Sequence, residues 1–208
     1  MNSESQANSA LHKKALRLSY FTLGYNLLEG LVSVFAGILA QSTALVGFGL
    51  DSFVESLSGG VMVWRFGKKW ASKEEEMKSE KKAVHLVAAA FFILGAYVLF
   101  ESAQKLYERR GAEPSLLGIA IAIVSLIVMP VLFLLKYRTG KKLESKSLVA
   151  DSKQTLACMF LSAALLAGLW LNYSFQIWWA DPAAGLLIAG YLLYEGYETW
   201  REGRLCAC

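Results

Sequence analysis

The sequence contains two acidic residues, Asp51 and Glu55, in an otherwise uncharged stretch, GFGLDSFVESLSGG. Their spacing of four residues puts both carboxylates on one face of a helix, one turn apart. Carboxylates inside an apolar helix are costly and usually have a functional role. Two of them in a low dielectric repel each other unless a proton or a cation lies between them. The pair therefore predicts a cation site, and a structural polar contact between helices is the alternative.

A second pair with the same spacing, Gln154 and Cys158, lies in the stretch ADSKQTLAC. A cysteine sulfur is a good ligand for soft metal ions, whereas a glutamine carbonyl oxygen is a weak one. The alternatives are packing for Cys158, because buried cysteines behave as small hydrophobic residues, and a hydrogen bond between helices for Gln154.

The elements that must position these pairs are apolar helices. The chain has 208 residues, of which 55% are hydrophobic and 18% charged, a balance that is more apolar than in soluble domains. We predict an all-α membrane protein, with residues 1–208 forming a single transmembrane domain and no separate soluble domain. Six stretches are long enough to cross about 30 Å of hydrocarbon as helices: residues 18–39, 43–64, 84–104, 115–135, 148–173 and 181–200.

The Asp51–Glu55 pair and the Gln154–Cys158 pair are expected at similar depths in the membrane. At about 1.5 Å per residue, Asp51 and Glu55 lie about 12 and 18 Å from the outer surface. Gln154 and Cys158, on a helix that runs the other way, lie about 21 and 15 Å from it, and Glu29 lies about 13 Å from it. We therefore expect the two faces to meet near the middle of the membrane.

The distribution of basic residues predicts how the chain is oriented in the membrane. Most of the 21 Lys and Arg residues flank the termini and the connections after the second and fourth stretches, and Lys136 is assigned to the latter connection. The opposite side has Lys105, Arg109 and Arg110. By the positive-inside rule both termini are cytoplasmic. Because the basic residues lie between apolar stretches and not on one polar surface, a nucleic-acid partner is not expected.

Other polar residues have secondary roles. Glu29 and Asn26 are second-tier candidates for the site or for the groups that support its ligands. Asp151 either caps the start of its helix or lines the access path, and the cap is favoured. Asp181 and Pro182 are typical of a helix start, with the aspartate as cap and the proline in the first turn.

The stretches STALVGFGLDSFVE and ADSKQTLAC resemble the cation diffusion facilitator family. This resemblance implies six transmembrane helices, a homodimer, and export of Zn²⁺ and related divalent cations, commonly against protons. The family site consists of a D/H-x-x-x-D pair on the second helix and an H/D-x-x-x-D pair on the fifth. Asp51 and Glu55 match the first pair with one conservative change, and Gln154 and Cys158 occupy the second pair's positions with other residue types.

The resemblance implies a transporter of the alternating-access type. In such a protein the first, second, fourth and fifth helices would surround the metal ion, and the third and sixth would pack outside them. Zn²⁺ is the favoured ion, and Cd²⁺, Fe²⁺, Mn²⁺ and Co²⁺ are alternatives. Without a histidine in the site, coupled protons would have to use the carboxylates or the thiol. The alternative function is a metal sensor or partner subunit that does not transport.

We expect no tightly bound cofactor and no enzymatic activity, since a core histidine, a nucleophile–base pair and the H-E-x-x-H pattern are all missing from the sequence. Many family members continue into a cytosolic metal-binding domain, and we expect this chain to be a small member without it. Dimerisation would then rely on membrane contacts, for which the small residues at 184–185 and 189–190 offer a close-packing surface. A bacterial inner membrane is the expected location.

Overall fold

The computed structural model of the chain describes residues 2–67, 73–143 and 146–202. Every regular element in these ranges is a helix, which confirms the all-α fold predicted from the sequence. The helices are α1 (Asn2–Leu39), α2 (Thr43–Gly67), α3 (Lys73–Glu108), α4 (Leu116–Lys142), α5 (Lys146–Phe175) and α6 (Ala180–Glu202).

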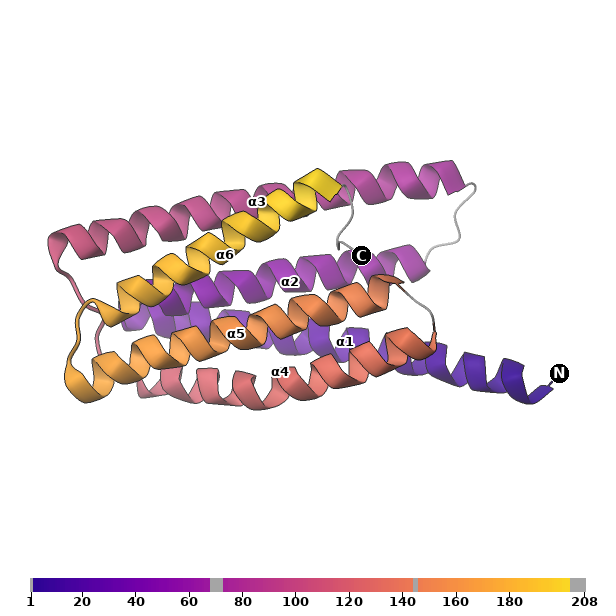
Figure 1. Ribbon diagram of the computed structural model, residues 1–208, viewed down its shortest axis with the longest axis horizontal. Coiled ribbons are helices and arrows are strands. Elements are labelled where there is room, and N and C mark those ends of the chain that lie inside the picture. Colours follow the sequence, from indigo (N-terminus) through magenta and orange to yellow (C-terminus); the bar gives the residue numbers. More distant parts are fainter. Residues whose placement is uncertain (1, 68–72, 144–145, 203–208) are drawn as a thin grey trace.

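The helices form an elongated bundle, and α1 begins at the end of the bundle where α2 and α4 finish (Figure 1). We call this the terminal end. The opposite end, which we call the short-loop end, holds the connections 40–42, 109–115 and 176–179. The connections at 40–42 and 176–179 are short, and α1 packs along α2 and α5 along α6.

Helix α2 lies in the centre of the bundle. It contacts α1, α3, α5 and α6, while α4 packs on α1 and α5. Figure 1 shows α3 and α6 paired along one side of α2. Helices α3 and α6 were expected to pack outside the other four, and both contact α2, while α6 also packs on α5.

Four helices have apolar stretches long enough to cross a membrane, judged on the described residues alone: Lys13–Leu39, His85–Glu108, Leu116–Lys142 and Asp151–Phe175. Helices α2 and α6 carry the acidic residues Asp51, Glu55 and Asp181 on buried faces. The neighbouring helices therefore shield these acidic groups.

Two helices are longer than the sequence indicated. Helix α3 starts at Lys73, so residues 74–82, which precede the apolar stretch expected from residue 84, form its first turns. Helix α4 continues to Lys142. The assignment of Lys136 to a cytoplasmic connection was therefore wrong, because this residue lies inside α4 with its side chain buried.

Helices α1 and α2 cross closely at two glycines. A β-carbon on Gly30 would lie 2.9 Å from the carbonyl oxygen of Gly49, and one on Gly49 would lie 2.9 Å from that of Gly30. Such distances are too short for a side chain, so glycine is required on both helices. The close approach brings Glu29 of α1 within hydrogen-bonding distance of Ser52 of α2.

The small residues of α6 pack within the chain. A β-carbon on Gly168 of α5 would lie 2.8 Å from that of Ala184, and one on Gly185 would meet the side chains of Thr43 and Ser102. Ala189 is also fully buried. The prediction that these residues form a dimer surface is therefore wrong for Ala184, Gly185 and Ala189, since neighbouring helices already cover them.

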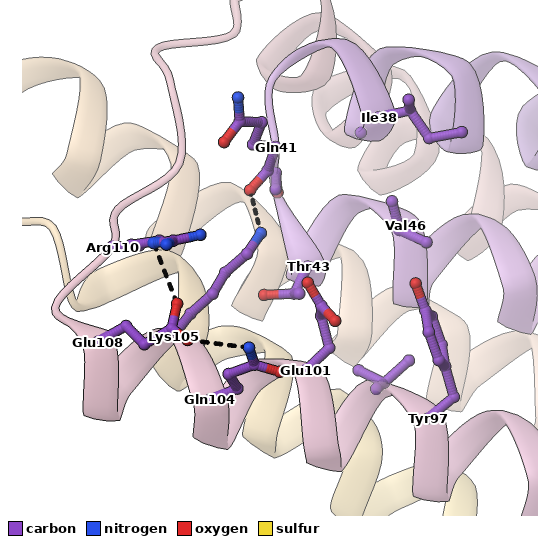
Figure 2. A pocket seen from close by; sticks show the side chains of 13 residues that line it. Ile38, Gln41, Thr43, Val46, Tyr97, Glu101, Gln104, Lys105, Glu108 and Arg110 are labelled. Carbon is purple, nitrogen blue, oxygen red and sulfur yellow. Dashed lines mark hydrogen bonds and ion pairs between the residues drawn. The ribbon is translucent and has the colours of Figure 1, made fainter.

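A cavity of about 260 Å³ opens at the short-loop end, between the α1–α2 connection and the last turns of α3. Figure 2 shows both signs of charge around it. Arg110 pairs with Glu108 at 3.0 Å, and Lys105 donates a hydrogen bond to the carbonyl oxygen of Gln41. The acidic side chains predicted to bind a cation, Asp51 and Glu55, do not line this cavity.

Candidate metal site

Asp51 and Glu55 lie on the buried face of α2, with 4% and 3% of their surfaces exposed. Because α2 has neighbouring helices on several sides, both carboxylates point into the bundle and not toward its surface. Asp51 lies within electrostatic range of Glu55 and also of Glu29 of α1. The structure therefore gathers acidic groups from α1 and α2 in the interior.

Helix α5 presents Cys158 and Gln154 to the same interior. Cys158 is 1% exposed, and it lies within electrostatic range of Asp51, Glu55 and Glu29. Helices α2 and α5 also make a direct polar contact, since the Thr155 hydroxyl lies 3.1 Å from Oε1 of Glu55. Gln154 is buried one turn from Cys158.

One oxygen of Glu55 lacks a partner. Its Oε2 atom is buried and makes no hydrogen bond within the described part of the chain. Both side-chain amide atoms of Asn26 on α1 are in the same condition. Buried polar atoms are nearly always hydrogen-bonded in folded proteins, so these atoms are available to an additional ligand.

Glu29 is held differently from Glu55, because each of its carboxylate oxygens accepts a hydrogen bond. The Tyr25 hydroxyl donates to Oε1 at 2.9 Å, and the Ser52 hydroxyl donates to Oε2 at 3.0 Å. Glu29 therefore has the surroundings of a supporting group fixed between α1 and α2.

A pair of serines joins α4 to α5 one turn from Cys158. The hydroxyl oxygens of Ser162 and Ser125 lie 2.8 Å apart, and Ser162 also lies 2.8 Å from the carbonyl oxygen of Cys158. Both serines are fully buried. This contact fixes α5 against α4 at the level of the predicted ligands.

Asp151 lies inside α5, which begins at Lys146, and its carboxylate lies 2.8 Å from the ammonium group of Lys136 on α4. The favoured prediction that Asp151 caps the helix start was therefore wrong. This role of Lys136 is not evident from the sequence, because a lysine near the end of an apolar stretch is typical of an interface residue.

Helix α6 also reaches the site. Tyr191 and Glu195 lie within electrostatic range of Asp51. Glu195, near the end of α6, is half-buried, and the sequence analysis did not include it among the candidate site residues. The available signal was its place on the same helix face as Tyr191, four residues earlier.

In the described ranges, no group of three or more His, Cys, Asp and Glu side chains lies close enough together to hold a metal ion. The acidic residues of α1 and α2 and the thiol of α5 face a common interior without forming a closed coordination shell. Binding a metal ion would therefore require these helices to move closer together, or water to complete the shell.

Comparison with known proteins gives a family match. The profile of the cation efflux transmembrane domain matches residues 20–205, which is most of the chain. Transmembrane protein 163 of Xenopus laevis is 24% identical over 188 residues, covering 89% of this chain and 66% of that protein.

Two bacterial relatives carry names that refer to metal or cation efflux. The cation-efflux pump FieF of Shewanella oneidensis is 25% identical over 172 residues, covering 80% of this chain and 58% of that protein. The manganese efflux system protein MneS of Bacillus subtilis is 18% identical over 176 residues, covering 82% of this chain and 60% of that protein. The chain thus spans less than two thirds of the length of these relatives.

Proposed function

The chain belongs to the cation efflux family, and we propose that it exports a divalent transition-metal ion across a membrane. Members of this family are transporters and not enzymes. The proposal rests on the carboxylate pair of α2, which is buried in the centre of the bundle. Within the described part of the chain, Oε2 of Glu55 has no hydrogen-bond partner. A buried, unsatisfied carboxylate oxygen is costly, and a bound cation removes this cost.

The proposed ligands are Asp51, Glu55 and Cys158, with Gln154 as a weaker one. Carboxylate oxygens and a thiolate together suit Zn²⁺, the favoured ion, and also Cd²⁺. The relatives' names support more than one metal, because MneS is named for manganese. Fe²⁺, Mn²⁺ and Co²⁺ therefore remain candidates.

The proposed mechanism is alternating access. Negative ligands hold the ion near the middle of the membrane, and rocking of the helices exposes the site to one side at a time. Protons that replace the metal on the carboxylates or the thiol drive release, which makes the protein an antiporter. The bias of basic residues supports a cytoplasmic location for both termini, and a homodimer in a bacterial inner membrane is the proposed setting.

Metal flux into proteoliposomes with an internal metal-sensitive dye tests the proposal. We expect saturable Zn²⁺ or Cd²⁺ flux that depends on a pH gradient and disappears in Glu55→Gln, which keeps the size of the side chain but removes its charge. Glu113→Gln is the matched control because Glu113 is exposed near the short-loop end. Flux that is equal in Glu55→Gln and wild type would contradict the proposed site.

A metal sensor or partner subunit on the same scaffold is the second candidate. The observation that favours it is the Gln154 and Cys158 pair, which differs from the residue types usual in transporting members. A sensor would bind metal in detergent, lose binding in Glu55→Gln, and give no flux of any of the five ions.

A further inference from the structure

The terminal-end side of Glu55 contains a buried ion pair. Lys136 of α4 is 1% exposed, and its ammonium nitrogen lies 2.8 Å from Oδ2 of Asp151 on α5. Lysine is almost never fully buried unless it is paired. Replacing a buried ion pair by apolar residues is often neutral or stabilising, so the packing of α4 on α5 does not by itself require these charges.

The hydroxyl group of Thr155 links this ion pair to Glu55 by hydrogen bonds. The Lys136 ammonium donates a hydrogen bond to Oγ1 of Thr155 at 3.0 Å. Thr155 in turn lies within donating distance of Oε1 of Glu55, at 3.1 Å, and of the carbonyl oxygen of Asp151, at 3.2 Å. A hydroxyl has one proton to donate, and because Lys136 occupies an acceptor position, that proton is directed to these two oxygens.

Only one of the two carboxylate oxygens of Glu55 therefore has a hydrogen-bond partner among the described residues. Oε1 receives the Thr155 hydroxyl, while Oε2 is buried without a partner among the described residues. Lys136 does not donate to Glu55 directly but acts through Thr155. Successive hydrogen bonds polarise one another, so the ammonium strengthens the bond from Thr155 to the carboxylate.

We propose that Lys136, Asp151 and Thr155 are positioning residues that hold Oε1 of Glu55 and present Oε2 to the transported metal ion. This inference rests on the proposed function, in which Glu55 is a ligand. Asp151 keeps the lysine charge from pairing with Glu55 itself, and Thr155 fixes the carboxylate rotamer. Groups that orient metal ligands in this way typically contribute 10- to 100-fold to metal affinity.

Thr155→Val is the first test variant, because it keeps the side-chain shape and removes the hydroxyl. We expect its dissociation constant for Cd²⁺ to rise about 10-fold or more, while Thr155→Ser, which retains the hydroxyl, stays near wild type. In proteoliposomes KM rises and kcat changes little. Loss of packing alone would not be rescued by serine, which is smaller.

The second variant is the double substitution Lys136→Met/Asp151→Leu. It tests the positioning role even if Thr155→Val fails to fold. Removing both charges together leaves no unpaired ion and keeps the thermal midpoint near that of wild type. Without the ammonium, Thr155 is no longer directed to Glu55, so the dissociation constant again rises about 10-fold.

The experiment measures Cd²⁺ binding by calorimetry on the detergent-solubilised full chain, with the thermal midpoint of each variant and with Glu55→Gln in parallel. Loss of binding in Glu55→Gln, together with weakened binding in Thr155→Val and in the double variant, supports the positioning role. If Glu55→Gln loses binding while the other two bind like wild type, the positioning role is overturned and the metal site stands. If Glu55→Gln binds like wild type, the proposed site itself fails, and the inference fails with it.

Discussion

The carboxylate of Asp181, in the first turn of α6, accepts a hydrogen bond from the backbone amide of Thr43, the first residue of α2, at 3.0 Å. It also accepts hydrogen bonds from the hydroxyls of Ser42 and Thr43. The prediction that Asp181 caps its own helix was therefore wrong, because it caps a different one. A negative charge is favourable at a helix N-terminus, so this contact anchors the short-loop end of the helix that carries Asp51 and Glu55.

Asp181→Ala is expected to lower the free energy of unfolding by about 1–3 kcal/mol, since it leaves the buried Thr43 amide without its partner. Asp181→Asn keeps an acceptor oxygen and is expected to lose less. Thermal unfolding in detergent checks this, with the exposed Glu113→Ala as the control. Equal midpoints for Asp181→Ala and the control would exclude the capping role.

Gly49→Ala is expected to destabilise the α1–α2 contact by about 1–3 kcal/mol, a typical cost of overpacking. The added methyl group would lie 2.9 Å from the backbone oxygen of Gly30, and a backbone atom cannot rotate away. Gly190→Ala is the matched control, since a β-carbon there meets no atom within 4 Å. The thermal midpoints of the two variants and wild type give the comparison, and a midpoint for Gly49→Ala at or above that of the control would contradict the close crossing.

The sequence was sufficient to predict the helical bundle and the acidic pair because both depend on local pattern. Long apolar stretches imply helices in a membrane, and charges four residues apart share a helix face. The partners of Lys136 and Asp181 were not predictable in this way. Each residue lies near the end of an apolar stretch, where a solvated position and a buried contact with another helix have the same local sequence.

The depth arithmetic placed Glu29, Asp51 and Cys158 at similar levels, and the structure brings these residues within electrostatic range of one another. The arithmetic gave no information about rotation of the helices. The approach of Tyr191 and Glu195 to Asp51 depends on which face α6 turns toward α2, and this is decided by small residues such as Gly185 that pack against neighbouring helices.

Glu29→Gln is expected to weaken Cd²⁺ binding by about 10-fold, the lower part of the range for groups that support ligands. Both oxygens of Glu29 already accept hydrogen bonds, from Tyr25 and Ser52, whereas Oε2 of Glu55 has no partner among the described residues. Glu55→Gln, in contrast, is expected to remove measurable binding. Calorimetric titrations of the two variants separate the roles, and complete loss of binding in Glu29→Gln would make Glu29 a ligand.

Cys158→Ser is expected to change which ion is preferred. Sulfur is a soft ligand that favours Cd²⁺ and Zn²⁺, whereas a hydroxyl oxygen is a hard ligand that suits Mn²⁺. If Cys158 binds the ion, the ratio of Cd²⁺ to Mn²⁺ affinity falls by about 10-fold or more in the serine variant, within the range reported for changes around metal sites. Competition titrations in detergent measure this ratio directly.

The control for this prediction is Cys158→Ala, which removes the sulfur without adding an oxygen. It is expected to weaken Cd²⁺ binding as Cys158→Ser does, but without any gain for Mn²⁺. Cys158 is buried in the core cluster, so both variants will lose some stability, and the thermal midpoints must be compared first. If both variants lose stability but keep the wild-type Cd²⁺ to Mn²⁺ ratio, Cys158 serves as a packing residue, and selectivity has to come from the oxygen ligands of α2.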